Sequence, residues 1–134
     1  MTKHFLLGAF TGLSLAAFSQ ISVNHIDPFI GTGGHGHTHP AATAPFGMVQ
    51  IGPDTRREGW DGCSGYHFTD STVWGFSHTH LSGTGVGDYG DFLFKPWGGP
   101  FADSPVAFDK SSERASAGTY SVRLTSGTLA EFTA

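Results

Sequence analysis

The segment TYSVRL, residues 119–124, is the clearest strand signal in this 134-residue sequence. Apolar and polar residues alternate along it, so an extended backbone places Tyr120, Val122 and Leu124 on one face. A turn at Ser126-Gly127 joins it to a second extended segment, residues 128–134. The two segments predict an antiparallel hairpin with one buried face.

Further short segments rich in β-branched and aromatic residues precede this hairpin, at residues 47–51, 72–77, 91–95 and 106–108. Turns separate them, among 20 glycines and seven prolines, and residues 110–117 are predicted to form a polar linker. No helical periodicity follows residue 20. The sequence therefore predicts an all-β fold, an antiparallel β-sandwich. The expected core residues are Phe46, Met48, Ile51, Val73, Phe76, Phe92, Phe94, Val106, Phe108, Tyr120, Val122 and Leu124.

The first 19 residues have the pattern of an export signal. Lys3 supplies a positive charge, residues 5–18 are almost uncharged and apolar, and small residues at Ala17 and Ser19 fit a cleavage site. The apolar stretch falls short of the roughly 20 residues that a membrane span needs. We therefore expect a signal peptide at 1–19 and a domain at 20–134, exported to the periplasm or the extracellular space without a membrane span.

Charge and cysteine content exclude some partners and crosslinks. The formal net charge is −4 and no basic run occurs, so nucleic acid is not an expected partner. Residues 54–58 form the one charged cluster, which predicts a solvated loop. Cys63 is the sole cysteine, so the chain cannot form an internal disulfide. Its position between Asp61 and Tyr66 favours a thiol in a binding site.

Residues 60–91 combine aromatic, histidine and aspartate residues with closely spaced glycines. A sugar offers apolar C–H faces and a ring of hydroxyls, so its site needs an aromatic platform beside short polar groups. Glycines let backbone groups approach those hydroxyls. The segment therefore predicts a carbohydrate site with Trp60 and Tyr66 as its platform and, as its polar groups, Asp61, His67, His78, His80 and Asp88. Cys63 is expected to line the same site.

A second glycine-rich loop, residues 31–40, carries histidines at alternate positions. On an extended backbone His35, His37 and His39 would point the same way. We expect His35 and His37 to form one edge of the same pocket.

Four segments carry a family resemblance: DPFIGTGGHGHTHPAATAPFGMVQIGPDTR (27–56), GWDGCSGYH (59–67), GFSHTHLSGTGVGDYGD (75–91) and ASAGTYSVRL (115–124). They resemble the N-terminal region of the family 92 glycoside hydrolases, exo-acting α-mannosidases of bacteria. The resemblance runs from about Asp27 to the last residue. It implies an N-terminal β-sandwich packed against a larger (α/α)6 barrel, with the active site where the two meet.

For a full-length enzyme the resemblance implies inverting hydrolysis that removes terminal α-mannose from mannose-containing glycans. It also implies that the bound calcium, the general acid and the general base belong to the barrel, which the sequence does not reach. We therefore assign no catalytic residue and no metal ligand to this chain. The expectation is an inactive, truncated part of an exported enzyme, and the unfinished final strand favours the same interpretation.

The residues leave two other functions open. His35, His37, His78 and His80 form two His-x-His pairs that could bind zinc in a metallohydrolase, although no His-Glu-x-x-His helix accompanies them. A stand-alone carbohydrate-binding β module would use the same aromatic and glycine-rich residues without catalysis. Zinc content and calorimetry with mannose would distinguish these hypotheses.

Overall fold

The computed structural model describes residues 22–44, 47–83 and 90–134. These residues form two antiparallel sheets, and their only helical elements are the 3-10 turns η1 (Val23–His25) and η2 (Trp60–Gly62). The smaller sheet has the order β1 (Gly52–Asp54), β3 (Gly75–Ser77), β4 (Leu93–Phe94). The larger sheet has the order β2 (Thr72–Val73), β5 (Val106–Ser116), β6 (Thr119–Leu124), β7 (Leu129–Thr133). The predicted all-β antiparallel sandwich is confirmed.

The predicted C-terminal hairpin is also confirmed. Strands β6 and β7 pair antiparallel along their length, and the apolar face of β6 is buried, with Tyr120, Val122 and Leu124 each no more than 2% exposed. Gly127 makes the turn with a φ of 90°, which glycine adopts without a Cβ clash. Because a one-residue slip would turn the apolar side chains to solvent, burial fixes the register of this hairpin.

The hydrophobic core lies between the two sheets. Phe76 of β3 joins them, with its ring centroid 4.8 Å from that of Phe132 and 6.3 Å from that of Tyr120. The buried core residues are Ala42, Val73, Phe76, Phe108, Tyr120, Val122, Leu124 and Ala130, with Ile51 and Val106 packed against them. Most of the predicted core is therefore correct where the structure describes it.

Three predicted core residues are wrong. Met48 is 86% exposed because it lies in an irregular segment before β1. Phe94 is 57% exposed on β4, an edge strand of the smaller sheet, and Phe92, which precedes β4, is 66% exposed. Phe46, also predicted to be in the core, lies outside the described residues.

Two predicted strands and the predicted linker need correction. The single strand expected at 72–77 is two strands in different sheets, separated at Trp74, whose N donates to Asp54 O at 2.8 Å. The strand expected at 47–51 begins instead at Gly52, and Pro53 is tolerated there because β1 is an edge strand. The polar linker expected at 110–117 is largely the second half of the eleven-residue strand β5.

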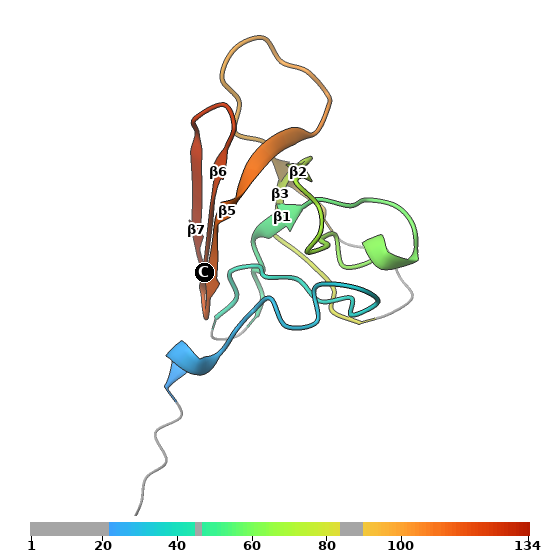
Figure 1. The fold of residues 1–134 in the computed structure, drawn as a ribbon, viewed down its shortest axis with the longest axis vertical. Coiled ribbons are helices and arrows are strands. Elements are labelled where there is room, and N and C mark those ends of the chain that lie inside the picture. Colours follow the sequence, from blue (N-terminus) through green and yellow to red (C-terminus); the bar gives the residue numbers. More distant parts are fainter. Residues whose placement is uncertain (1–21, 45–46, 84–89) are drawn as a thin grey trace, which may run out of the picture.

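The glycine-rich loops converge beside the smaller sheet. In Figure 1, β5, β6 and β7 stand side by side, and the cyan and green loops gather on the side of β1 and β3 that faces away from β7. Phe68 N donates to Thr32 O at 2.8 Å, and Gly83 N donates to His37 O at 2.8 Å. These bonds join the loops that carry the predicted site residues. Within the described ranges, no helix has the length and apolar character needed to cross a bilayer.

Candidate functional site

Trp60 and Asp61 lie on η2 beside the loop of residues 31–40, which is called the histidine loop below. These two residues, together with His35 and His37, are called the Trp60 corner. Trp60 is 58% exposed, and its ring centroid lies 5.1 Å from that of His37 in an edge-on arrangement. Asp61 Oδ1 accepts hydrogen bonds from His35 Nδ1 at 2.7 Å and from His37 Nε2 at 3.3 Å. The fold thus brings four of the predicted site residues together.

The Asp61 carboxylate is held in its ionised form. The hydrogen bond from His35, more than that from His37, holds the pKa of the Asp61 carboxyl below its usual value of 3.8. Both imidazoles use Oδ1, and Oδ2 has no hydrogen-bond partner among the described residues. An aromatic face therefore lies beside a fixed anionic acceptor, an arrangement that suits a ligand with an apolar side and a hydroxyl.

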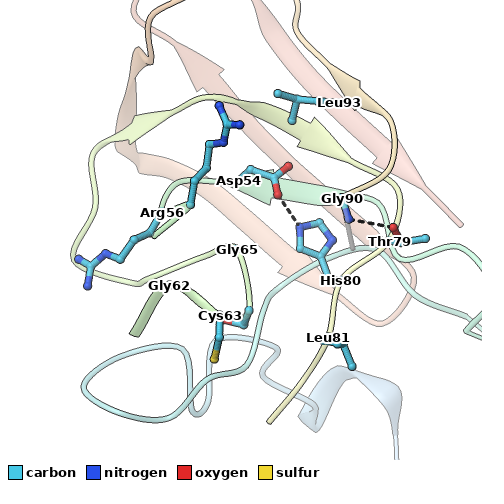
Figure 2. A pocket seen from close by; sticks show the side chains of 12 residues that line it. Asp54, Arg56, Gly62, Cys63, Gly65, Thr79, His80, Leu81, Gly90 and Leu93 are labelled. Carbon is cyan, nitrogen blue, oxygen red and sulfur yellow. Dashed lines mark hydrogen bonds and ion pairs between the residues drawn. The ribbon is translucent and has the colours of Figure 1, made fainter. Parts of the chain in front are cut away.

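A cavity of about 250 Å³ adjoins η2 at Gly62 and Cys63 (Figure 2). It is smaller than the roughly 300–1,000 Å³ of pockets that hold drug-sized ligands, so it suits one small polar group or ring. Half-buried Cys63 lines it and donates from Sγ to Gly83 O at 3.3 Å. The residues that give it chemical character are Asp54, Arg56, Cys63, Thr79 and His80.

Asp54 and His80 meet inside this pocket (Figure 2), with Asp54 Oδ1 and His80 Nε2 3.4 Å apart. Asp54 accepts from Ser77 N at 2.7 Å and from Ser77 Oγ at 2.9 Å. His80 Nδ1 donates to Gln50 O at 2.7 Å, which fixes the orientation of the ring. Ser77 is fully buried, so its hydroxyl orients the aspartate and is not available as a nucleophile.

His39 packs on His80 from the other side, with ring centroids 4.9 Å apart. Burial, assisted by the neighbouring His80, lowers the pKa of His39 to about 4. His39 is therefore neutral at physiological pH. His39 belongs to the alternating pattern of residues 31–40, but the sequence predicts only His35 and His37 as site residues.

Two of the predicted site residues, Tyr66 and His67, are buried. Tyr66 is 1% exposed and its hydroxyl donates to Glu113, so its ring offers no face to a ligand in this structure. His67 is 8% exposed; its Nε2 donates to Gly34 O at 3.1 Å and its Nδ1 lies 2.8 Å from Thr69 Oγ1. His67 joins two loop segments, whereas Tyr66 joins its loop to strand β5.

His78 and Asp88 are the other predicted site residues, and neither is part of the arrangement described above. His78 is half-buried and its ring packs on Phe92 at 5.2 Å between centroids. Asp88 lies outside the described residues. The paired spacing of His78 and His80 does not bring the two side chains to one site, because His80 turns into the pocket with Asp54.

The zinc hypothesis does not fit this arrangement. No group of three or more histidine, cysteine, aspartate or glutamate side chains in the described part of the chain is placed to hold a metal ion. His35 and His37 face Asp61, whereas His80 bonds to Gln50, so the two His-x-His pairs do not form one ligand set. Calcium takes oxygen ligands, and no such group of carboxylates gathers in the described ranges either.

Sequence reasoning missed Asp54, Arg56 and Glu113. Asp54 is 9% exposed, and Arg56 forms an ion pair with Asp70 at 2.6 Å, so the solvated loop predicted at 54–58 is wrong for its first three residues. A charged run is usually solvated, and no local pattern reports the partners of these side chains. Glu113 is buried because Tyr66, 47 positions away, supplies a hydroxyl to it.

Comparison with known proteins identifies the family. Residues 25–134 match the glycosyl hydrolase family 92 N-terminal domain. The chain belongs to glycosyl hydrolase family 92. The predicted family resemblance is thereby confirmed over the hairpin, the loops and the pocket described above.

Solved structures of family 92 enzymes share the fold. A family GH92 α-mannosidase from Bacteroides thetaiotaomicron is 40% identical, with a TM-score of 0.79 over 84% of this chain and 17% of that chain. The same enzyme in complex with mannoimidazole also gives a TM-score of 0.79. A family GH92 inverting mannosidase from the same organism is 28% identical, with a TM-score of 0.67 over 84% of this chain and 16% of its own.

A fungal relative extends the comparison. An uncharacterized secreted glycosidase of Arthroderma benhamiae is 30% identical over 138 residues, which cover 95% of this chain and 18% of that protein. This family 92 chain therefore spans less than a fifth of the length of these relatives.

Proposed function

We propose that this chain supplies the N-terminal part of the substrate site of an exported α-mannosidase that removes terminal α-mannose from glycans by inverting hydrolysis. The observation that carries the proposal is the exposed Trp60 ring beside Asp61, whose Oδ2 is free among the described residues. The 40%-identical relative that was solved with mannoimidazole supports this ligand class.

Each residue at this corner has a defined task in the proposal. The indole of Trp60 stacks on an apolar face of the sugar, and Asp61 accepts a hydrogen bond from one of its hydroxyls. His35 and His37 hold Asp61 in place, so the carboxylate needs no reorganisation when the sugar arrives. The Cys63 and His80 pocket next to η2 takes a further part of the sugar or its glycan.

Catalysis is assigned to other parts of a longer polypeptide. Inverting hydrolysis needs a general acid and a general base about 6.5–9.5 Å apart, with room for water between them. Neither carboxylate of the candidate site is proposed for either task, because Asp54 is engaged by Ser77 and Asp61 by the histidine loop. We likewise assign the calcium of a full-length enzyme to that other part, since the described residues do not fit it.

Export is part of the proposal. The charged and apolar pattern of residues 1–19 favours a signal peptide, and one relative is a secreted glycosidase. The proposed destination is the periplasm or the extracellular space.

A titration with methyl α-mannoside tests the proposal. Followed by amide NMR shifts, the 134-residue chain is expected to bind the sugar saturably, on the order of millimolar affinity, with shifts centred on residues 60–63. Trp60→Ala removes the binding, whereas Trp97→Ala, which truncates an indole in the loop after β4, leaves it unchanged. Absence of binding, or equal binding in both variants, contradicts the proposed site.

An activity assay tests the division of labour. The chain alone is expected not to hydrolyse an aryl α-mannoside, because the acid and base belong to the remainder of the enzyme. Hydrolysis that survives both Trp60→Ala and Asp61→Asn would show that the catalytic groups lie elsewhere in this chain.

A further inference from the structure

Glu113 carries a buried carboxylate that the sugar site does not explain. Its side chain is 2% exposed, yet Oε1 accepts from Tyr120 OH at 2.7 Å and from Tyr66 OH at 3.0 Å. Lys110 Nζ lies 2.6 Å from Glu113 Oε2 and 2.6 Å from Tyr66 OH. Every oxygen of the carboxylate therefore has a partner, as a buried charge requires.

An irregularity in β5 creates this cluster. Asp109 pairs with Arg123 and Arg114 pairs with Ser121, so residues 110–113 of β5 stand opposite only Val122 of β6. The extra residues bend the strand and direct Lys110 and Glu113 toward Tyr66. The ammonium also lies 5.0 Å from the centroid of the Tyr66 ring and 4.4 Å from that of Phe68.

The two tyrosines remain donors to this carboxylate. Burial first, and then the charge of Glu113, raise the pKa values of Tyr66 and Tyr120 well above the usual value for a phenol. Both phenols donate to Glu113 Oε1, and only the Tyr66 hydroxyl also accepts a hydrogen bond from Lys110. They differ in what they are attached to: Tyr120 belongs to the core strand β6, and Tyr66 to the segment that walls the pocket.

The backbone next to Tyr66 lies directly on the Asp54–His80 pair. A Cβ on Gly65 would lie 3.0 Å from Asp54 Oδ1 and 3.1 Å from His80 Cδ2. Gly65 O accepts from Thr55 N at 2.8 Å, and Ser64 Oγ donates to Tyr66 O at 3.2 Å. Anchoring the Tyr66 side chain therefore fixes how residues 63–65 lie over the pocket.

We propose that Glu113 is a positioning residue that acts through the Tyr66 hydroxyl to hold Gly65 against the Asp54–His80 pair and Cys63 in the wall of their pocket. The proposal rests on the proposed function only in taking the ligand of this pocket to be a sugar. The positioning itself is a property of the fold and can be measured without a ligand.

Cys63 is a natural probe of this positioning, because it is the sole cysteine and it lines the pocket. The rate at which the 134-residue chain reacts with the chromogenic disulfide DTNB reports how freely residues 63–65 move away from the pocket. Tyr66→Phe is expected to raise this rate by about threefold or more. Tyr120→Phe removes the equivalent bond to Glu113 Oε1 and is expected to leave the rate within about twofold.

Both rates are measured at a temperature at which circular dichroism shows the two variants to be folded. Equal acceleration in Tyr66→Phe and Tyr120→Phe would overturn the proposal, because the cluster would then act only on global stability. Acceleration confined to Tyr66→Phe, reproduced by Glu113→Gln, supports it.

A titration of the same variants with methyl α-mannoside separates this proposal from the proposed function. Weaker sugar binding in Tyr66→Phe than in Tyr120→Phe supports both. A chain that binds no sugar but keeps the contrast in thiol reactivity overturns the proposed function and supports the positioning role. Equal thiol rates overturn the positioning role whether or not the sugar binds.

Discussion

Asp61 accepts a 2.7 Å hydrogen bond from His35, although the two residues are 26 positions apart in the sequence. The bond joins two glycine-rich loops at the exposed Trp60 corner. Because it favours the ionised carboxylate, it holds the pKa of Asp61 below 3.8. Its stabilising contribution is therefore present above about pH 3.8 and is lost as the pH falls through the lowered pKa of the folded state.

Replacing His35 tests this relationship. His35→Ala is expected to raise the pKa of Asp61 toward 3.8, because the bond from His35 is the largest cause of its lowering. Titration of the Asp61 carboxyl carbon by NMR measures the change. His25→Ala, which removes an exposed histidine of η1, should leave the titration midpoint unaltered. An unchanged midpoint in His35→Ala would mean that the hydrogen bond does not form in solution.

His39 predicts a dependence of stability on pH. Its pKa of about 4 in the folded chain lies below the ordinary value of 6.5, so between these pH values the unfolded state binds a proton that the folded state does not. Stability therefore falls as the pH falls from about 6.5 to about 4, by at most about 3 kcal/mol from this residue. His80 and Asp54 are the charged or titratable groups that influence it.

Urea unfolding at pH 7 and pH 4.5 measures this dependence. His39→Asn is expected to lose less stability between the two pH values than the parent chain does, whatever its stability at pH 7. His25→Asn should lose as much as the parent. An equal loss in all three chains would show that folding does not lower the pKa of His39.

Local signals explain which parts of the fold the sequence predicts. The alternation in residues 119–124 depends only on neighbouring residues, and so the β6–β7 hairpin was predictable. The division of residues 72–77 between two sheets was not, because it depends on the contact of Gly75 with β4: a Cβ there would lie 2.8 Å from Leu93 Cγ and from Phe94 O. Neither atom is near in the sequence.

The candidate site shows the same limit. The composition of residues 60–91 singled out Trp60 and Asp61, and the alternating histidines of residues 31–40 singled out their partners. Composition could not report that Tyr66 points into the interior, because the group that holds it there, Glu113, lies 47 positions away within an irregular strand. Residue types therefore predicted the kind of site, and long-range contacts decided which of its members face a ligand.

Phe76 and Phe94 give a matched pair for the stability of the core. They are direct partners across β3 and β4, but Phe76 is fully buried and Phe94 is 57% exposed. Phe76→Ala is expected to cost about 3–5 kcal/mol of unfolding free energy, whereas Phe94→Ala should cost less than about 1 kcal/mol. Urea denaturation measures both. Similar losses would mean that β4 is covered in solution.

Gly65 lies close to the Asp54–His80 pair, and replacing it with alanine tests this contact. Gly65 has a φ of 79° and Gly127 a φ of 90°, so alanine at either position incurs a backbone penalty of about 1 kcal/mol. At Gly127 no atom lies within 4 Å of the new Cβ, whereas at Gly65 the nearest atom, Asp54 Oδ1, is 3.0 Å away. Gly65→Ala is therefore expected to lose about 1–2 kcal/mol more unfolding free energy than Gly127→Ala in urea denaturation.

The extra loss of stability arises because the Asp54–His80 pair must move. Gly65→Ala should therefore also weaken binding of methyl α-mannoside, while Gly127→Ala should not. Equal stability and equal affinity in the two variants would show that the backbone of residues 63–65 does not rest on that pair.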